Sequence, residues 1–324
     1  MRNEVARLPR LLTSLANQVG GLPFTLCMFF DNCDDGSEQL VASWAERVPF
    51  TIVSDCCGSG GAPNAGAARR RAMALCIDRV RADVLLTTDA DSEPAGNWIA
   101  ANLKALQLAD IVAGRIIRAD HRTPDVHDRI CAYFDGLHAM RRTLDPVPWE
   151  SAETHHWTSG ASLAVTGEVY RDLGGFEAKE SGEDAAFIDG AARAGYRVRR
   201  DAQVIVRTSS RRKGRARNGF ADSLSAFDDG VLAPDMVHPA DEAWRFRTQA
   251  VARMAFEARD MRPLPQLLGL PPAEVDEVAA ACVNAEAFVA RIVGAPPGGM
   301  RMLGLAHAEA LLAGADQLAM AGAA

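Results

Sequence analysis

The chain has 324 residues, of which 48% are hydrophobic and 24% charged, and its formal net charge is −7. These proportions predict a folded globular protein rather than a disordered one, and the negative charge argues against a general nucleic-acid binder. No apolar run approaches the roughly 20 residues of a membrane-spanning helix, the polar start lacks a signal-peptide pattern, and an odd number of scattered cysteines favours free thiols in the cytoplasm.

The first 120 residues alternate between helical and strand patterns. Apolar residues recur at helical spacing over 5–19, and the continuous apolar run 24–30 predicts a strand buried on both faces. Strands alternating with helices indicate βαβ units and a mostly parallel sheet, whose ligands bind at the carboxyl ends of the strands. The other predicted strands are 50–53, 83–88 and 111–117, and the other predicted helices are 67–80 and 94–108, the latter opened by Pro94.

The pattern changes after Pro124. A long helix is predicted over 126–144, and the segments that follow are short until about Pro239. From there the chain is Ala-rich and helical, which predicts a helical C-terminal extension. The short segments are strands at 162–165 and 204–206 and helices at 168–173 and 184–194.

Asp89-Ala90-Asp91 directly follows the apolar strand 84–88. Two carboxylates one residue apart at a strand end can converge on one hard cation, for which Mg²⁺ or Mn²⁺ fits best. The alternative is that Asp91 or Ser92 caps the next helix.

Several motifs together resemble the family-2 glycosyltransferases, whose nucleotide-binding domain has the GT-A fold. The resemblance covers roughly residues 2–222, and its motifs stand in the family's order. They are Asn3-Glu4, Asp31-Asn32-Cys33-Asp34-Asp35, Ala65-Gly66-Ala67-Ala68-Arg69, Thr88-Asp89-Ala90-Asp91, Ser159-Gly160-Ala161-Ser162-Leu163, Gly174-Gly175-Phe176 and Gly182-Glu183-Asp184.

The resemblance implies a metal held by Asp91 with help from Asp89, which would neutralise the charge on a departing nucleoside diphosphate. Asp89 also becomes a candidate contact for the nucleotide's ribose. Many members of this fold supply a further His ligand from a later strand. The corresponding stretch here reads Val206-Arg207-Thr208-Ser209, so no third ligand is evident.

Asp31 and Arg69 are the other candidate contacts for the nucleotide sugar. Asp31 can accept a hydrogen bond from a base or ribose, or it can simply stabilise its acidic turn. Arg69 stands in the first turn of a predicted helix and can pair with phosphate or stack near the base.

Asp184 and Glu183 are the candidate catalytic residues. The acceptor hydroxyl needs a base, and in inverting members the Asp of this Glu-Asp pair has that role, so we rank Asp184 first. Both acids also suit the positive N-terminal end of the helix that follows, and the two roles are compatible.

Six basic residues crowd the stretch 207–217. It is either a solvated loop or a cationic lid that closes over diphosphate or an anionic acceptor.

We therefore expect an α/β protein with a GT-A domain over 1–238, divided into a nucleotide-binding half (1–120) and an acceptor-binding half (121–238), and a helical extension over 239–324. The expected reaction is metal-assisted transfer of a hexosyl group from a nucleoside diphosphate sugar to an unknown hydroxyl acceptor. The alternatives are a sugar nucleotidyltransferase and an inactive nucleotide-sugar-binding protein on the same scaffold.

The family opens with a buried strand before its Asn-Glu motif, whereas only Met1 and Arg2 precede Asn3 here. By fold analogy that strand lies between the strands 24–30 and 83–88. We therefore expect a vacancy or a distortion between these strands, and we read the chain as one whose natural form begins upstream.

Overall fold

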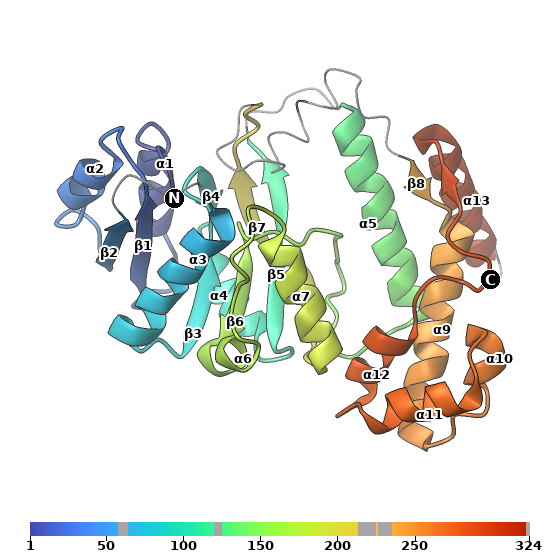
Figure 1. Cartoon of the computed structure of the whole chain (residues 1–324). Helices are drawn as coiled ribbons and strands as arrows, with labels where there is room; N and C mark the ends of the chain where they lie inside the picture. Colours follow the sequence, from blue (N-terminus) through green and yellow to red (C-terminus); the bar gives the residue numbers. More distant parts are fainter. Residues whose placement is uncertain (58–63, 120–124, 213–224, 226–234, 322–324) are drawn as a thin grey trace. The chain divides into compact units, whose positions relative to one another are not determined.

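The computed structural model describes residues 1–57, 64–119, 125–212, 225 and 235–321. The chain divides into two compact units that alternate along the sequence. Unit 1 comprises Met1–Arg122, Trp157–Asp189 and Val198–Ser225, and unit 2 comprises Thr123–His156, Gly190–Arg197 and Ala226–Ala324. Figure 1 labels most of the elements of both.

Unit 1 begins with helix α1 (Leu8–Ala16), which has Pro9 in its first turn. Its leucines at positions 8, 11, 12 and 15 lie on one face and are almost completely buried, as their helical spacing predicts. Strand β1 (Thr25–Asp31) follows, and helix α2 (Ser37–Trp44) connects it to strand β2 (Thr51–Cys57). The two strands pair in parallel and form a sheet of their own.

A second sheet in unit 1 has five strands in the order β3-β6-β5-β7-β4. Strands β5 and β7 are parallel, and the other neighbours are antiparallel. The expected α/β class is confirmed, but the sheet is mixed rather than mostly parallel. The strands are β3 (Val84–Thr87), β4 (Ser92–Pro94), β5 (Ile111–Arg118), β6 (Leu163–Thr166) and β7 (Val198–Thr208).

Strands β5 and β6 pair antiparallel although the helix Val126–Leu144 lies between them, because the chain does not return to the end of the sheet at which β5 begins. A helix between two strands normally returns the chain to the same end of the sheet, which makes the strands parallel. Residues 145–162, which precede β6, contain no helix or strand, and the chain enters β6 against the direction of β3 and β5.

Helices flank these sheets in unit 1. Helix α3 (Ala65–Ala74) continues as a π-helix, η1 (Leu75–Val80), where one helix was predicted over 67–80. The remaining helices are α4 (Trp98–Ala105), α6 (Gly167–Asp172) and α7 (Glu183–Ala194), whose residues from Gly190 on belong to unit 2.

The predicted helix start at Pro94 is wrong. Pro94 ends strand β4 and pairs with Val206 of β7, and α4 begins four residues later. Strand β4 lies at the edge of its sheet, where proline is tolerated because no neighbour needs its missing N–H. Ser92 does not cap a helix either, since its hydroxyl donates to Oγ1 of Thr208 at 3.0 Å.

Unit 2 is built on the long helix α5 (Val126–Leu144), whose two ends are those predicted. Asp125 and Asp128 form a reciprocal capping box at its start. The C-terminal helices are α9 (Pro239–Ala258), α10 (Leu264–Leu268), α11 (Pro272–Ala280), α12 (Ala285–Ile292) and α13 (Leu305–Ala321), and the short strands β8 (Met236–Val237) and β9 (Met302–Leu303) pair antiparallel.

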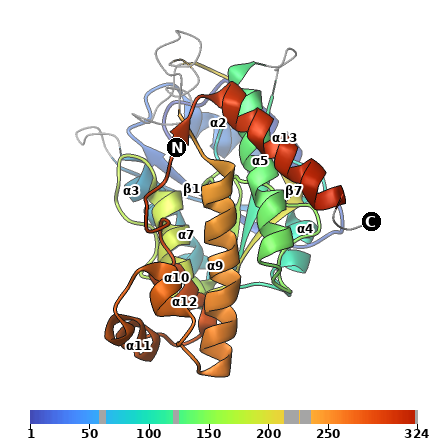
Figure 2. The same ribbon diagram turned by 90° about the vertical axis from the view of Figure 1, so that its right-hand side faces the viewer.

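Helices α5, α9 and α13 lie side by side (Figure 2). Ile130, Tyr133 and Leu137 of α5 share one core with Ala308 and Leu312 of α13. Unit 2 thus joins α5 to the C-terminal helices, while the predicted boundaries at 120 and 238 stay a prediction. Among the described residues, no helix combines the length and the apolar character needed to cross a membrane.

Candidate active site

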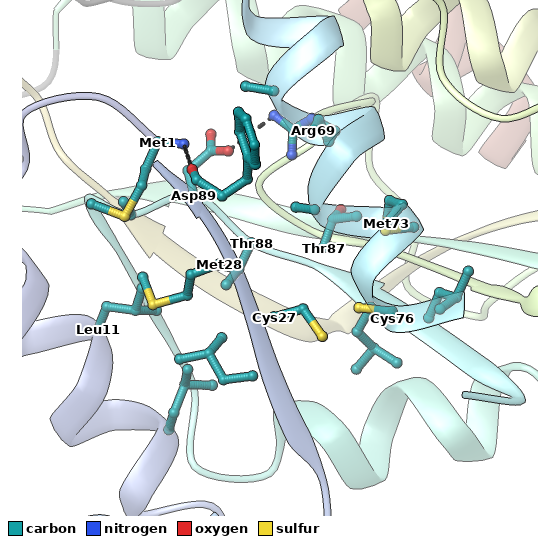
Figure 3. A pocket seen from close by; sticks show the side chains of 18 of the residues that line it. Met1, Leu11, Cys27, Met28, Arg69, Met73, Cys76, Thr87, Thr88 and Asp89 are labelled. Atoms are coloured by element: carbon teal, nitrogen blue, oxygen red, sulfur yellow. Dashed lines mark hydrogen bonds and ion pairs between the residues drawn. The ribbon is translucent and has the colours of Figure 1, made fainter. Parts of the chain in front are cut away.

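One cavity of unit 1, with a volume of about 910 Å³, brings the predicted site residues together. Figure 3 shows its polar end, where Arg69 and Asp89 are bonded near Met1. The charged residues that line the cavity are Arg2, Glu4, Asp31, Arg69, Asp83, Asp89, Asp91, Glu183, Asp184 and Arg211. All six residues predicted for the site are among them.

Arg69 connects the two acidic motifs. Its guanidinium donates to Glu183 Oε1 at 3.0 Å and to Asp89 Oδ1 at 3.0 Å, and also to the carbonyl oxygen of Gly160 at 2.6 Å. Burial disfavours the charged guanidinium, but Asp89 and Glu183 outweigh that effect and raise the pKa of Arg69. Arg69 is therefore a fixed cation that holds Asp89, at the end of a strand, and Glu183, at the start of a helix, close together.

Two glycines and one asparagine explain why Arg69 points there. Asn64 caps α3 by accepting the N–H of Ala67 at 2.7 Å. A Cβ at Gly66 would lie 2.3 Å from the carbonyl oxygen of Glu177, and a Cβ at Gly160 would lie 2.2 Å from Cζ of Arg69. Only glycine allows both close approaches, which gives the Ala-Gly-Ala-Ala-Arg and Ser-Gly-Ala motifs a physical reason.

Asp184 and Glu183 begin helix α7 but have different surroundings. Glu183 is 4% exposed and is held by Arg69. Asp184 is partly exposed and accepts the N–H of Gly160 at 2.7 Å and its neighbour Ala185's at 2.8 Å. Of the two predicted catalytic acids, Asp184 is the one a substrate can approach.

Asp91 lies beside a cation from a distant part of the chain. Arg211 pairs through Nη2 with Asp91 at 3.1 Å and through Nη1 with Glu4 at 2.6 Å. Burial, followed by repulsion from Asp89, raises the pKa of Asp91 to about 6, although Arg211 opposes the shift. Glu4 is itself 6% exposed. Three carboxylates thus crowd this end of the cavity.

Asp31 ends β1 at the same cavity and accepts hydrogen bonds from Asn32 at 2.8 Å and from the thiol of Cys57 at 3.3 Å. In the turn that follows Asp31, the backbone N–H groups of Val5 and Ser37 donate to the carboxylate of Asp35 instead. Asp31 stabilises its turn through the bond from Asn32, and its contact with a nucleotide stays a prediction.

Sequence reasoning missed the partnership of Glu4 and Arg211, because the two residues are 207 positions apart. The only available signal was the basic composition of the stretch 207–217. Residues 213–217 of that stretch lie outside the described residues, so the predicted lid stays a prediction.

The residues at Asp91 fit a hard divalent cation. Asp89, Asp91 and Glu4 offer carboxylate oxygens, the preferred ligands of Mg²⁺ and Mn²⁺, and like charges crowded together favour a cation between them. In the described part of the chain, the one group of three ligand-type side chains already close enough to share an ion is Asp125, His127 and Asp128 in unit 2. The capping box of α5 accounts for its two acids.

The model of glycosyl transferase family 2 matches residues 1–158 of this chain. The family-2 resemblance is confirmed. That match covers the strand-end acids, Arg69 and α5, and it supports glycosyl transfer as the activity. The helix-start acids Glu183 and Asp184 lie beyond the matched residues. No curated protein matches the chain.

Solved glycosyltransferase structures are similar to this one at low identity. One is TarS 1-349 of S. aureus in complex with UDP-GlcNAc (13% identity, TM-score 0.48, covering 86% of this chain and 77% of that one). Another is the mannosyltransferase PcManGT of Pyrobaculum calidifontis with GDP-Man and Mn²⁺ (18% identity, TM-score 0.47, covering 89% and 75%). Neither likeness is strong enough to bear on the ligands of this chain.

Proposed function

We propose that the chain transfers a hexosyl group from a nucleoside diphosphate sugar to a hydroxyl acceptor, assisted by a divalent cation. The observation that carries the proposal is the gathering of Asp89, Asp91, Glu183 and Asp184 in one cavity, in a chain whose first half matches family 2. Such a transfer needs a base for the acceptor hydroxyl and positive charge for the departing diphosphate.

We assign the base to Asp184. The acceptor oxygen attacks the anomeric carbon of the sugar, its proton passes to the Asp184 carboxylate, and the bond from that carbon to the diphosphate oxygen breaks. The backbone N–H groups of Gly160 and Ala185 hold the carboxylate in place. Glu183, tied to Arg69, supports the position of that arginine rather than the proton transfer.

Asp91, with Asp89, would hold Mn²⁺ or Mg²⁺, and the bound cation would supply positive charge to the departing diphosphate. Arg211 also lines the cavity and offers a second positive group to the phosphates. Asp31, Arg69 and Asp89 are the proposed contacts of the nucleotide sugar. Because three of Arg69's N–H groups are already bonded within the protein, its main contribution is to fix Asp89.

Thermal unfolding in the presence of UDP- and GDP-linked hexoses, with and without Mn²⁺, tests the proposal. A ligand at a hundred times its dissociation constant stabilises the folded chain by about 2.7 kcal/mol, so at least one donor should raise the melting temperature in the presence of Mn²⁺. Asp91→Ala should lose this metal-dependent shift and remain folded. Asp78→Ala, at an exposed position on η1, is the matched control and should keep the shift.

The same panel, extended to nucleoside triphosphates with sugar phosphates, separates the alternatives when the released product is measured alongside binding. Donor binding without transfer or hydrolysis would identify an inactive binding protein. Release of pyrophosphate from a nucleoside triphosphate and a sugar phosphate would identify a nucleotidyltransferase. If Asp91→Ala keeps its Mn²⁺-dependent shift, the metal assignment fails.

A further inference from the structure

Two thiols from different elements of unit 1 face each other in the cavity. Cys27 of β1 and Cys76 of η1 both line it, and Figure 3 shows the side chain of Cys27 pointing toward Cys76. Both residues are half-buried, and both are free thiols. The proposed transfer reaction gives neither of them a role.

A second contact between the same two elements explains why the thiols face each other. Alternate side chains of a strand point to the same side, so Cys27 and Phe29 share one face of β1. The guanidinium carbon of Arg71 lies 5.1 Å from the ring centroid of Phe29, which packs this face of β1 against α3. Because η1 directly continues α3, Cys27 faces the same helix further along.

The two thiols differ in acidity. The S–H group of Cys76 donates a hydrogen bond to the sulfur of Cys27, and this bond lowers the pKa of the Cys27 thiol although burial opposes the shift. The same bond, together with burial, raises the pKa of the Cys76 thiol. Since the thiolate is the reactive form of cysteine, Cys27 is the nucleophile of the pair and Cys76 is the second thiol beside it.

We propose that Cys27 and Cys76 form a modification site, at which a peroxide that enters the cavity oxidises the two thiols to a reversible disulfide between β1 and η1. Both residues line the cavity, so a small thiol can reach the disulfide and reduce it again. The inference does not depend on the proposed function.

The oxidation proceeds in two steps. The Cys27 thiolate attacks the terminal oxygen of the peroxide, the O–O bond breaks, and the other oxygen takes a proton from solvent and leaves as water or an alcohol. Cys27 is then a sulfenic acid. The sulfur of Cys76 attacks the sulfur of Cys27, the S–O bond breaks, and the hydroxyl group leaves with the proton of Cys76 as water. The peroxide gains the two electrons that the thiols lose.

The disulfide joins the two elements that carry candidate contacts of the nucleotide sugar. Asp31 follows Cys27 by four residues on β1, and Arg69 precedes Cys76 by seven residues on the helix. Four residues of a strand span about 13 Å and seven residues of a helix about 10 Å. The crosslink therefore ties β1 to the helix at a similar distance from both residues and occupies the place of neither.

Oxidation of the full chain with hydrogen peroxide, followed by trypsin digestion and mass spectrometry, tests the proposal. Trypsin releases residues 11–47, which contain Cys27, separately from residues 72–79, which contain Cys76. Cys33 lies on the first of these peptides, so the experiment is run on the parent chain and on Cys33→Ser.

The disulfide between the two peptides should form at least tenfold faster than any other in both chains, and dithiothreitol should reverse it. Cys282 of unit 2 is also half-buried and, as the reference thiol, should stay reduced. Cys27→Ser and Cys76→Ala should each lose this disulfide. Disulfides spread over several cysteines, or formed mainly between two chains, would overturn the proposal.

Thermal unfolding shows whether the crosslink fits the folded chain. Because a disulfide restricts the unfolded chain, the oxidised form of Cys33→Ser should melt several degrees above its reduced form. Cys27→Ser treated with the same peroxide should show no such rise, and it corrects for oxidation elsewhere. A disulfide that lowers the melting temperature relative to this control would contradict the proposal, because β1 and η1 would then have to be distorted to form it.

Discussion

At the scale of single residues, Asp184 shows that a helix-start acid and a candidate base can be the same side chain. Its two oxygens each accept one backbone N–H, which fixes the carboxylate while leaving further lone pairs for a proton. The two roles that the sequence suggests for Asp184, interaction with the positive end of the helix and acceptance of a proton, are therefore compatible.

Asp184→Asn should lower turnover by about a hundred- to ten-thousand-fold, the usual contribution of a general base. Donor affinity should stay within a few-fold, because Asp184 is not among the proposed nucleotide contacts. Asn offers one carbonyl oxygen to two N–H donors, so we also expect a loss of about 1–3 kcal/mol of stability. Steady-state kinetics and thermal unfolding measure both effects.

Asp189→Asn, at an exposed position on the same helix, is the control for Asp184→Asn and should change neither quantity. Turnover of Asp184→Asn at the level of the parent chain would leave Asp184 with its structural role alone.

Arg211 pairs with Asp91, the proposed metal ligand, and with Glu4. Arg211→Ala should bind Mn²⁺ several-fold more tightly than the parent chain, because the cation no longer competes with a guanidinium for Asp91 and Glu4. The electron paramagnetic resonance signal of free Mn²⁺ measures this directly. The exposed Arg207 lies only four residues earlier, so Arg207→Ala is the matched control. Weaker Mn²⁺ binding by Arg211→Ala would show that Arg211 assists the metal site instead.

At the scale of elements, Tyr133 ties helix α5 to strand β8. The side chain is 2% exposed, and its hydroxyl donates to the carbonyl oxygen of Val237. Burial, with Glu242 nearby, raises the pKa of Tyr133 to about 12. Because the folded chain holds this proton more tightly than the unfolded chain, the resulting stability is complete below pH 10 and is lost as the pH rises to 12.

Tyr133→Phe should cost about 1 kcal/mol at pH 7 through the lost hydrogen bond. Between pH 10 and 12 the parent chain should lose about 2 kcal/mol relative to the Phe variant, because the full free energy of a shift by two pKa units is reached only above pH 12. Urea unfolding at several pH values checks the difference, and a gap independent of pH would contradict the assignment.

Elements with local signals were predictable, and those set by distant partners were not. The start of helix α5 has such a local signal, because Asp125 and Asp128 form its capping box within four residues. Strand β4 was missed because its pairing with β7 lies more than a hundred residues away and overrides the local preference of Pro94. In the site, the motif acids were found from their neighbours in sequence, whereas the Glu4–Arg211–Asp91 contact has no local pattern.

At the scale of the whole molecule, the C-terminal helices do not form a unit without α5. Apolar residues of α5 and α13 share a core, and Arg253 of α9 bonds to Asp145 directly after α5. A fragment of residues 239–324 should therefore lack a cooperative thermal transition, because the faces that α5 covers become exposed. Circular dichroism during heating tests this, with the full chain as reference. A sharp melt of the fragment would show that it is an independent domain.

The alternation of the two units along the chain also bears on how such a protein can change over time. The backbone passes between the units five times, at residues 122–123, 156–157, 189–190, 197–198 and 225–226. One of these passages falls within α7, whose first turn carries Glu183 and Asp184. Recombination that exchanges one continuous stretch of gene can therefore never replace either unit intact. Unit 2 should therefore diverge by point substitutions and loop insertions. Unit 2 and the acids at the start of α7 should be inherited together.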